Sequence, residues 1–195
     1  MKQLSIILSV FVFTALAAHS GQAAIVVNAV EVNGDVVFSG SGSLTFDGWN
    51  ELNGSFSDVG SVNPGNARVG VATPITSPTP ADFYRGLAAG PADFGPGNVT
   101  LADSHTGDIF GIQTRTTIIV PRDYVPGTFL EGSMTIESAT FASLQMTPGT
   151  YVWTWGSLGQ EDSFTLNIFP EPTSLALLGL GGLIVSRRRC SQRSR

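Results

Sequence analysis

The sequence predicts an all-β protein: one antiparallel β-sandwich or jelly-roll-like domain with a targeting segment at each end. Short runs of β-branched and aromatic residues recur about every eight to twelve residues, separated by glycine, proline or polar turns. No amphipathic helical period of useful length occurs between residues 24 and 169. The chain has 195 residues, which is enough for one domain with its own core and two signals.

The first segment, residues 1–23, is predicted to be a cleaved signal peptide. Lys2 precedes an apolar run over residues 4–18, and small residues follow it. This is the order of a secretory signal. Cleavage after Ala23 places Gly21 and Ala23 at the two small-residue positions, and cleavage after Ser20 is the alternative.

Most apolar segments of residues 24–169 are predicted to be strands. Residues 25–32 and 35–39 flank Asn33-Gly34, a strong two-residue hairpin signal. Further strands are expected at residues 43–47, 68–72, 108–112, 115–120, 128–136, 139–144, 151–155 and 163–169. Residues 60–103 are rich in proline and glycine and are predicted to be largely irregular. The segment "PITSPTP" within this range is interpreted as a surface crossover. The alternative is an extended polyproline structure that a partner protein recognises.

The charges argue against nucleic acid as a partner. Residues 24–169 hold four arginines, no lysine and fourteen acidic residues. Such an acidic surface repels phosphate backbones. The single cysteine, Cys190, lies among the terminal arginines, so no disulfide framework is implied.

The C-terminal segment has the features of a membrane-retention signal. Residues 173–186 are uncharged and mostly apolar. As a helix they would span roughly 21 Å, less than the ~30 Å of a bilayer core. A basic cluster over residues 187–195 follows, beginning with Arg187, Arg188 and Arg189. These arginines favour a cytoplasmic C-terminus and temporary rather than permanent anchoring.

Pro170-Glu171-Pro172, the apolar segment and the arginine cluster together resemble the PEP-CTERM sorting signal of Gram-negative bacteria. That resemblance implies processing by an exosortase-type membrane protease near the Pro-Glu-Pro, and an ordinary C-terminal anchor is the alternative. The segments "GDVVFSGSGSLTF", "PRDYVPGTFLEGSMTIESATFASLQMTPGTY" and "GTYVWTWGSLGQEDSFTLNIFPEP" also resemble a recurrent kind of PEP-CTERM exported protein. This second resemblance implies a β-rich exported domain and brings no assigned activity.

Residues suited to catalysis are few. His105 is the one histidine left after signal cleavage. Its neighbour Ser104 cannot form a serine-histidine pair through sequence adjacency alone, and the sequence contains no G-x-S-x-G motif, so a hydrolase triad is not supported. Zinc-ligand spacing is also absent from the sequence. Paired carboxylates are the better enzymatic candidates: Glu131 and Glu137 on a strand, and Glu161 with Asp162 in a turn. The favoured interpretation is that they are solvent-facing charges. No cofactor is expected.

Two binding hypotheses remain. Asp103 and Asp108, in "DSHTGD", offer oxygen ligands for calcium, although an ordinary turn explains them equally. Tyr151, Trp153 and Trp155 share one face of a strand by two-residue spacing. They could stack sugar rings, but burial in the core is the favoured interpretation because Val152 alone offers little apolar surface opposite.

The sequence therefore predicts a non-enzymatic exported protein, sorted by a PEP-CTERM/exosortase-type system. Its expected partners are the secretion machinery, signal peptidase, an exosortase-type protease and extracellular polysaccharide. It would be anchored transiently in the inner membrane and then reach the cell surface or extracellular matrix, with a structural or adhesive role in exopolysaccharide or biofilm. The alternative is a carbohydrate-binding or glycan-processing jelly-roll protein.

Overall fold

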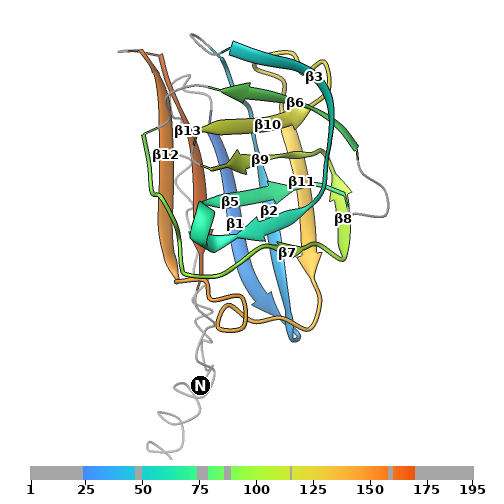
Figure 1. Cartoon of the computed structure of the whole chain (residues 1–195), viewed down its shortest axis with the longest axis vertical. Coiled ribbons are helices and arrows are strands. Elements are labelled where there is room, and N and C mark those ends of the chain that lie inside the picture. The colour runs from blue at the N-terminus through green and yellow to red at the C-terminus, as the bar shows by residue number, and fades with distance from the viewer. Residues whose placement is uncertain are drawn as a thin grey trace, which may run out of the picture.

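Figure 1 shows the computed structural model, which describes residues 24–46, 50–73, 79–85, 89–114, 116–157 and 160–169. The predicted signal peptide, the sorting motif, the apolar segment 173–186 and the arginine cluster lie outside these ranges. Among the described residues, none belongs to a helix long and apolar enough to cross a membrane.

The described strands form two sheets. The first sheet has six strands in the order β12 (Gly149–Ser157), β13 (Gln160–Ile168), β1 (Ala24–Val32), β2 (Asp35–Gly42), β11 (Leu130–Ile136) and β8 (Ser104–Gly107). The second has seven, in the order β3 (Asn50–Asp58), β6 (Thr79–Arg85), β10 (Thr117–Pro121), β9 (Phe110–Gln113), β5 (Arg68–Val71), β4 (Ser61–Asn63) and β7 (Thr100–Leu101). One short 3₁₀ turn, η1 (Pro64–Asn66), joins β4 to β5.

The two sheets pack face to face around one apolar core. This core joins Phe38, Trp153 and Phe164 of the first sheet to Ile112 and Ile118 of the second. Figure 1 shows the strands of the second sheet running across those of the first. This crossed arrangement is the orthogonal way of packing two sheets, in contrast to the aligned sandwich.

Two-residue alternation determines which side chains enter the core. On β13, Phe164, Leu166 and Ile168 are buried while the residues between them are partly exposed. Successive side chains of a strand point to opposite faces, so every second residue is available to the core. The alternation predicted for residues 163–169 is confirmed.

The predicted first hairpin is also confirmed. β1 and β2 pair antiparallel from Ile25↔Gly42 to Val32↔Asp35. Asn33 and Gly34 both have positive φ, at 56° and 91°, as a type I′ turn requires.

The expectation of a purely antiparallel arrangement is wrong at one place. β1 pairs parallel with β13, from Ala24↔Ser163 to Ala29↔Ile168. The first and last strands of the described chain are therefore neighbours inside the first sheet. All other described strand pairs are antiparallel.

The predicted strand at residues 139–144 is wrong, because this segment forms turns. The Leu144 N–H donates to the Thr140 carbonyl at 3.0 Å, and the Met146 N–H donates to the Phe141 carbonyl at 2.8 Å. The step from Phe141 to Leu144 is three residues, which suits a helical turn and breaks a strand period. Both side chains are nevertheless buried.

The predicted strand at residues 43–47 is wrong as far as it is described. The Ser43 N–H still donates to the Ala24 carbonyl of β1. The next two N–H groups bind side chains instead of a neighbouring strand: Leu44 donates to the Tyr124 hydroxyl and Thr45 to the Asp162 carboxylate. Leu44 and Thr45 therefore have side-chain acceptors where a strand would have the backbone carbonyls of its neighbours.

The prediction that residues 60–103 are largely irregular is wrong in part, since β4, β5, β6 and β7 lie within them. Predicted strand 108–112 also begins late: β9 starts at Phe110, and β8 occupies the segment read as a turn. The segment 89–99 does lack a ladder, yet it is held in place. Phe94 is buried, its N–H donates to the Pro64 carbonyl at 3.0 Å, and its carbonyl accepts from the Thr147 N–H at 2.9 Å.

Candidate functional site

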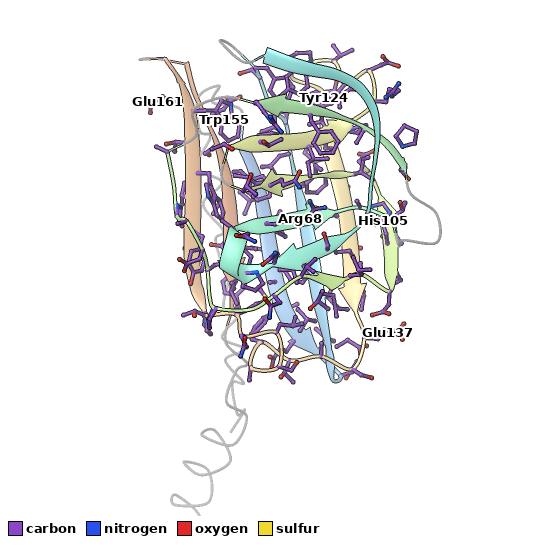
Figure 2. All side chains as sticks on the ribbon, viewed as in Figure 1. Arg68, His105, Tyr124, Glu137, Trp155 and Glu161 are labelled. Carbon is purple, nitrogen blue, oxygen red and sulfur yellow. The ribbon has the colours of Figure 1, made fainter. Side chains whose placement is uncertain are left out.

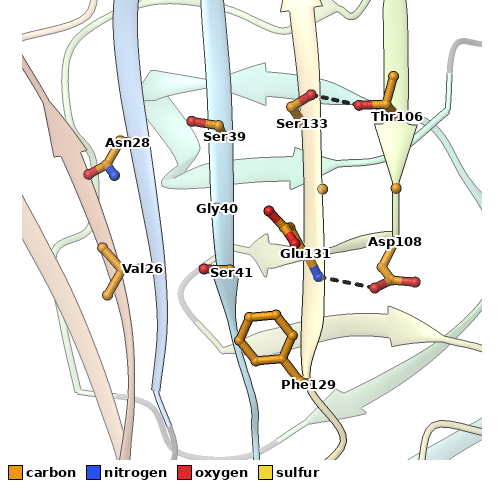
Figure 3. Close-up of a pocket in the computed structure, with 12 residues that line it drawn as sticks. Val26, Asn28, Ser39, Gly40, Ser41, Thr106, Asp108, Phe129, Glu131 and Ser133 are labelled. Atoms are coloured by element: carbon orange, nitrogen blue, oxygen red, sulfur yellow. Dashed lines mark hydrogen bonds between the residues drawn. The ribbon is translucent and has the colours of Figure 1, made fainter. Parts of the chain in front are cut away.

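The first sheet has an outer face, turned away from the core, that is hollowed into a groove of about 770 Å³. The groove lies over β1, β2, β11 and β8 (Figure 3). Its lining is made of small or polar side chains with few exceptions. The residues that line the groove are Val26, Asn28, Ser39, Gly40, Ser41, Thr106, Gly107, Asp108, Phe129, Glu131, Gly132 and Ser133. A hollow of this volume is in the range that holds a small organic ligand.

One line of short polar side chains crosses all six strands of this outer face. We call it the polar row. Each member is the register partner of the next: Thr150, Asn167, Asn28, Ser39, Ser133 and Thr106. Neighbouring strands lie about 4.8 Å apart, so the row presents hydroxyl and amide groups at a regular spacing.

Hydrogen bonds join neighbouring members at each end of the polar row. The Thr150 hydroxyl donates to the Asn167 amide oxygen at 2.9 Å, and the Asn167 amide nitrogen donates to the Asn28 amide oxygen at 3.0 Å. At the other end, the hydroxyls of Thr106 and Ser133 lie 2.9 Å apart. Figure 3 shows the nitrogen of the Asn28 amide turned toward β2, so a hydrogen-bond donor faces the middle of the groove.

The next positions along the strands make the groove amphipathic. Val26, Ser41 and Glu131 are register partners beside the polar row. Val26 is 40% exposed and Phe129, just before β11, is 64% exposed. Figure 3 shows the Phe129 ring at the end of the groove away from the polar row. The groove thus has the polar row on one side and, on the other, the apolar Val26 and Phe129 beside the polar Ser41 and Glu131.

Glycine is required on the inner side of the same strands. A Cβ added to Gly40 would lie 2.8 Å from the Val26 carbonyl oxygen, and one added to Gly132 would lie 2.3 Å from the Asp108 carbonyl oxygen. Gly132 is the register partner of both Gly40 and Gly107. Three neighbouring strands therefore approach one another where none has a side chain, beneath the outward-facing serines.

The charge in the groove is negative. Asp108 and Glu131 supply two carboxylates, and the lining contains no lysine, arginine or histidine. The Asp108 carboxylate accepts the Glu131 backbone N–H at 3.0 Å, which fixes the aspartate against β11 (Figure 3). An anionic ligand would be repelled here, and a ligand that donates hydrogen bonds would be favoured.

The structure does not bring the calcium candidates Asp103 and Asp108 together. They flank β8 and bind opposite ends of β11: Asp108 accepts the Glu131 N–H, and Asp103 accepts the Glu137 N–H at 2.8 Å. Those two partners are six positions apart, roughly 20 Å of extended chain, whereas calcium ligands lie about 2.5 Å from the ion. Within the described ranges, no group of three or more His, Cys, Asp or Glu side chains could hold a metal ion.

The tryptophans are core residues, so the hypothesis that they stack sugars is wrong. Trp153 is 0% exposed and Trp155 is 4% exposed. Their ring N–H groups donate to the carbonyls of Pro91 at 3.0 Å and Thr45 at 3.3 Å. Tyr151 lies half-buried on the same face, with its hydroxyl donating to the Thr147 carbonyl at 2.9 Å. Burial raises the pKa of Tyr151.

The carboxylates suggested as catalytic pairs are separated. Glu131 is exposed on β11, but Glu137 lies in the turn after that strand. Glu161 and Asp162 lie on β13 rather than in the predicted turn; Glu161 is exposed and Asp162 is buried. Figure 2 shows Glu137 and Glu161 at opposite ends of the molecule. Asp162 instead accepts hydrogen bonds from the backbone N–H and hydroxyl of Thr45, at 2.5 and 2.7 Å.

His105 lies on the edge strand β8, with its Nε2 3.1 Å from the Asp108 carbonyl oxygen (Figure 2). Ser104, its neighbour, is on the opposite face of the strand, as adjacent strand residues are. The two side chains are therefore not paired as nucleophile and base, which agrees with the sequence analysis.

Sequence reasoning missed the polar row, although part of its signal is visible. The segment Ser39-Gly40-Ser41-Gly42 alternates hydroxyls with glycines, which places the serines on one face of a strand. The other members come from strands that become neighbours only through the sheet order.

The sorting-motif residues Pro170, Glu171 and Pro172 and the arginines Arg187, Arg188 and Arg189 lie outside the described residues. Comparison with protein families finds a PEP-CTERM protein-sorting motif at residues 170–189. The chain therefore carries this motif at its C-terminal end, which supports export and processing by exosortase-type machinery. No curated protein and no solved structure matches the chain.

Proposed function

We propose that this PEP-CTERM protein is non-enzymatic and has a structural or adhesive role at the cell surface or in the extracellular matrix, within exopolysaccharide or biofilm. The sorting motif at residues 170–189 is the observation that supports the export and exosortase-type processing in this proposal. The motif starts two residues after β13 ends at Ile168. Cleavage near Pro170-Glu171-Pro172 therefore leaves the pairing of β13 with β1 and β12 intact.

The route begins with the secretion machinery and signal peptidase. The apolar segment 173–186 then holds the chain in the inner membrane, with the arginine cluster in the cytoplasm. An exosortase-type protease removes or transfers this tail and delivers residues 24–169 to the outside.

Support for a non-enzymatic role comes from what the acidic side chains do. Several carboxylates accept backbone N–H groups from distant segments and so hold loops against the sheets. These pairs are Glu31 with Phe141, Asp35 with Ser138, Asp82 with Asp123, Asp103 with Glu137, Asp108 with Glu131, and Asp162 with Thr45. A carboxylate engaged in this way stabilises the fold.

The test is the intact mass and cellular location of the protein in its own host, with and without the exosortase. We expect mass to be lost at both ends and the protein to accumulate outside the cell, and the N-terminal mass will separate cleavage after Ala23 from cleavage after Ser20. Glu171→Gln should block tail removal. Glu161→Gln, which changes an exposed glutamate on β13, is the matched control. A full-length chain that stays in the inner membrane of normal cells would contradict the proposal.

The second candidate is a carbohydrate-binding protein. The buried tryptophans remove its original support. The amphipathic groove on the first sheet is the observation that now favours it.

A further inference from the structure

We infer that the groove on the outer face of the first sheet binds a stretch of uncharged polysaccharide. The ligand's hydroxyl groups contact the polar row, and its apolar ring faces contact Val26 and Phe129. This inference deepens the matrix role proposed above. It rests on that proposal only for the extracellular location, where the protein would meet polysaccharide.

The polar row matches a polyhydroxylated ligand. Ser39, Ser133 and Thr106 carry hydroxyls that both donate and accept hydrogen bonds, and Asn28 adds an amide. A sugar hydroxyl also does both, so each can find a partner without leaving a buried polar group unpaired. The carboxylates of Asp108 and Glu131 add acceptors that bind neutral O–H donors more strongly than neutral groups do.

The apolar side of the groove suits the faces of sugar rings. Phe129 is 64% exposed, so its ring is open to a ligand at this end of the groove. Stacking of an apolar ligand face on the ring removes this surface from water. Val26, on β1, adds a second exposed apolar side chain to the groove.

A chain fits better than a free sugar. The groove itself lies over four strands, yet the polar row continues beyond it through Asn167 on β13 to Thr150 on β12. Six strands at about 4.8 Å spacing give a row roughly 24 Å long. This is longer than one sugar ring, so successive units of a chain can occupy it.

Charge and composition disfavour other occupants. The two carboxylates and the absence of any cation from the lining disfavour acidic polysaccharides and phosphate-bearing ligands. A protein partner, including a second copy, needs an apolar centre with anchors such as Trp, Tyr or Arg. The groove offers only Val26 and Phe129 as large apolar side chains.

The experiment is affinity electrophoresis of the protein as its own cells accumulate it. The gels contain hydroxyethyl cellulose, galactomannan, xylan or dextran as neutral probes, and alginate as the acidic probe. We expect retardation in at least one neutral gel and none in alginate. Salt should change the retardation little, because no ion pair is involved.

Two variants test the site itself. Phe129→Ala should raise the apparent Kd roughly tenfold, the effect of losing one aromatic stacking contact. Val125→Ala, which removes a 67% exposed side chain from the same loop but outside the groove, is its control. Ser39→Trp fills the middle of the polar row and should abolish retardation. Val32→Trp, at an exposed position at the end of β1, is its control.

Three results would overturn the inference: no retardation by any neutral polysaccharide, retardation in alginate alone, or equal effects of each variant and its control. Self-association that is lost in Phe129→Ala would identify the face as an interface between copies instead. Loss of export with retained binding would count against the proposed route alone, so the two proposals fail separately.

Discussion

The hydroxyl of Tyr124 accepts a hydrogen bond from the backbone N–H of Leu44 at 3.0 Å, although the two residues are 80 positions apart. The same hydroxyl donates to the Thr128 carbonyl at 2.7 Å. One buried phenol therefore ties the segment after β2 to the loop before β11. That loop carries Phe129, so the pair also fixes the apolar end of the groove.

Removing this hydroxyl should destabilise the protein. In Tyr124→Phe the buried Leu44 N–H loses its acceptor, which should lower the free energy of unfolding by about 1–3 kcal/mol. Urea denaturation measures the loss. Tyr151→Phe is the control, because that hydroxyl only donates to Thr147 at the surface and should cost less than ~1 kcal/mol. An equal decrease in the free energy of unfolding in both variants would argue against a stabilising hydrogen bond between Leu44 and Tyr124.

The same tyrosine predicts a loss of stability at alkaline pH. Burial raises the pKa of Tyr124 above its ordinary value of 10.0, against the opposing effect of the bond from Leu44. The folded protein therefore keeps the phenolic proton at pH values where the unfolded chain has lost it. This contribution to stability is fully present below about pH 10 and is lost as pH rises through the folded-state pKa. The free energy of unfolding should fall above pH 10, and less steeply in Tyr124→Phe.

The packing of Gly95 against the turn at residues 141–145 should not tolerate a side chain. Gly95 has φ of 144°, and a Cβ there would lie 2.1 Å from the Gln145 carbonyl oxygen. Gly34→Ala is the matched control, because Gly34 also has positive φ, at 91°, but nothing lies within 4 Å of its Cβ position. We expect Gly95→Ala to cost at least about 1 kcal/mol more in thermal or urea unfolding. A similar cost at both sites would show that the clash is relieved.

Asp162 should matter for the folded state rather than for chemistry. Its carboxylate, 4% exposed, accepts both the backbone N–H and the hydroxyl of Thr45. Asp162→Ala leaves two donors without this acceptor and should cost about 2–3 kcal/mol. Asp162→Asn keeps one oxygen acceptor and should cost clearly less. If both variants unfold at the same urea concentration as the parent protein, the hydrogen bonds from Thr45 to Asp162 do not stabilise the fold.

The protein should bind polysaccharide without cutting it. Incubation with the neutral probes should release no reducing ends above buffer. Catalysis by a carboxylate pair needs two groups held on either side of one bond, and Asp108 is held against the β11 backbone. Release of reducing ends that Glu131→Gln abolishes would make the groove an active site and end the non-enzymatic interpretation.

The features that the sequence predicted are local. Asn33-Gly34 specifies its hairpin because a type I′ turn needs positive φ at both central positions. Trp153 and Trp155 face the core together because strand side chains alternate with period two. The sorting motif is a contiguous segment, so it is found at residues 170–189 without any fold.

The errors occur where distant partners override local pattern. Residues 43–46 have an alternating strand pattern, yet the N–H groups of residues 43–45 bind Ala24, Tyr124 and Asp162 from three separate segments. Asp103 and Asp108 look like one ligand cluster in sequence, but pairing of β8 with β11 sends them to opposite ends of a neighbouring strand.

The sequence alone thus determined the β-rich class, the first hairpin, the core face of β12 and the C-terminal sorting motif, since each depends on residues a few positions apart. Only the tertiary structure decided the parallel pairing of β1 with β13, the crossing of the two sheets and the polar row from Thr150 to Thr106. The row draws single residues from six strands. Its members become neighbours only when backbone hydrogen bonds set the strand order and register, and no local period encodes either.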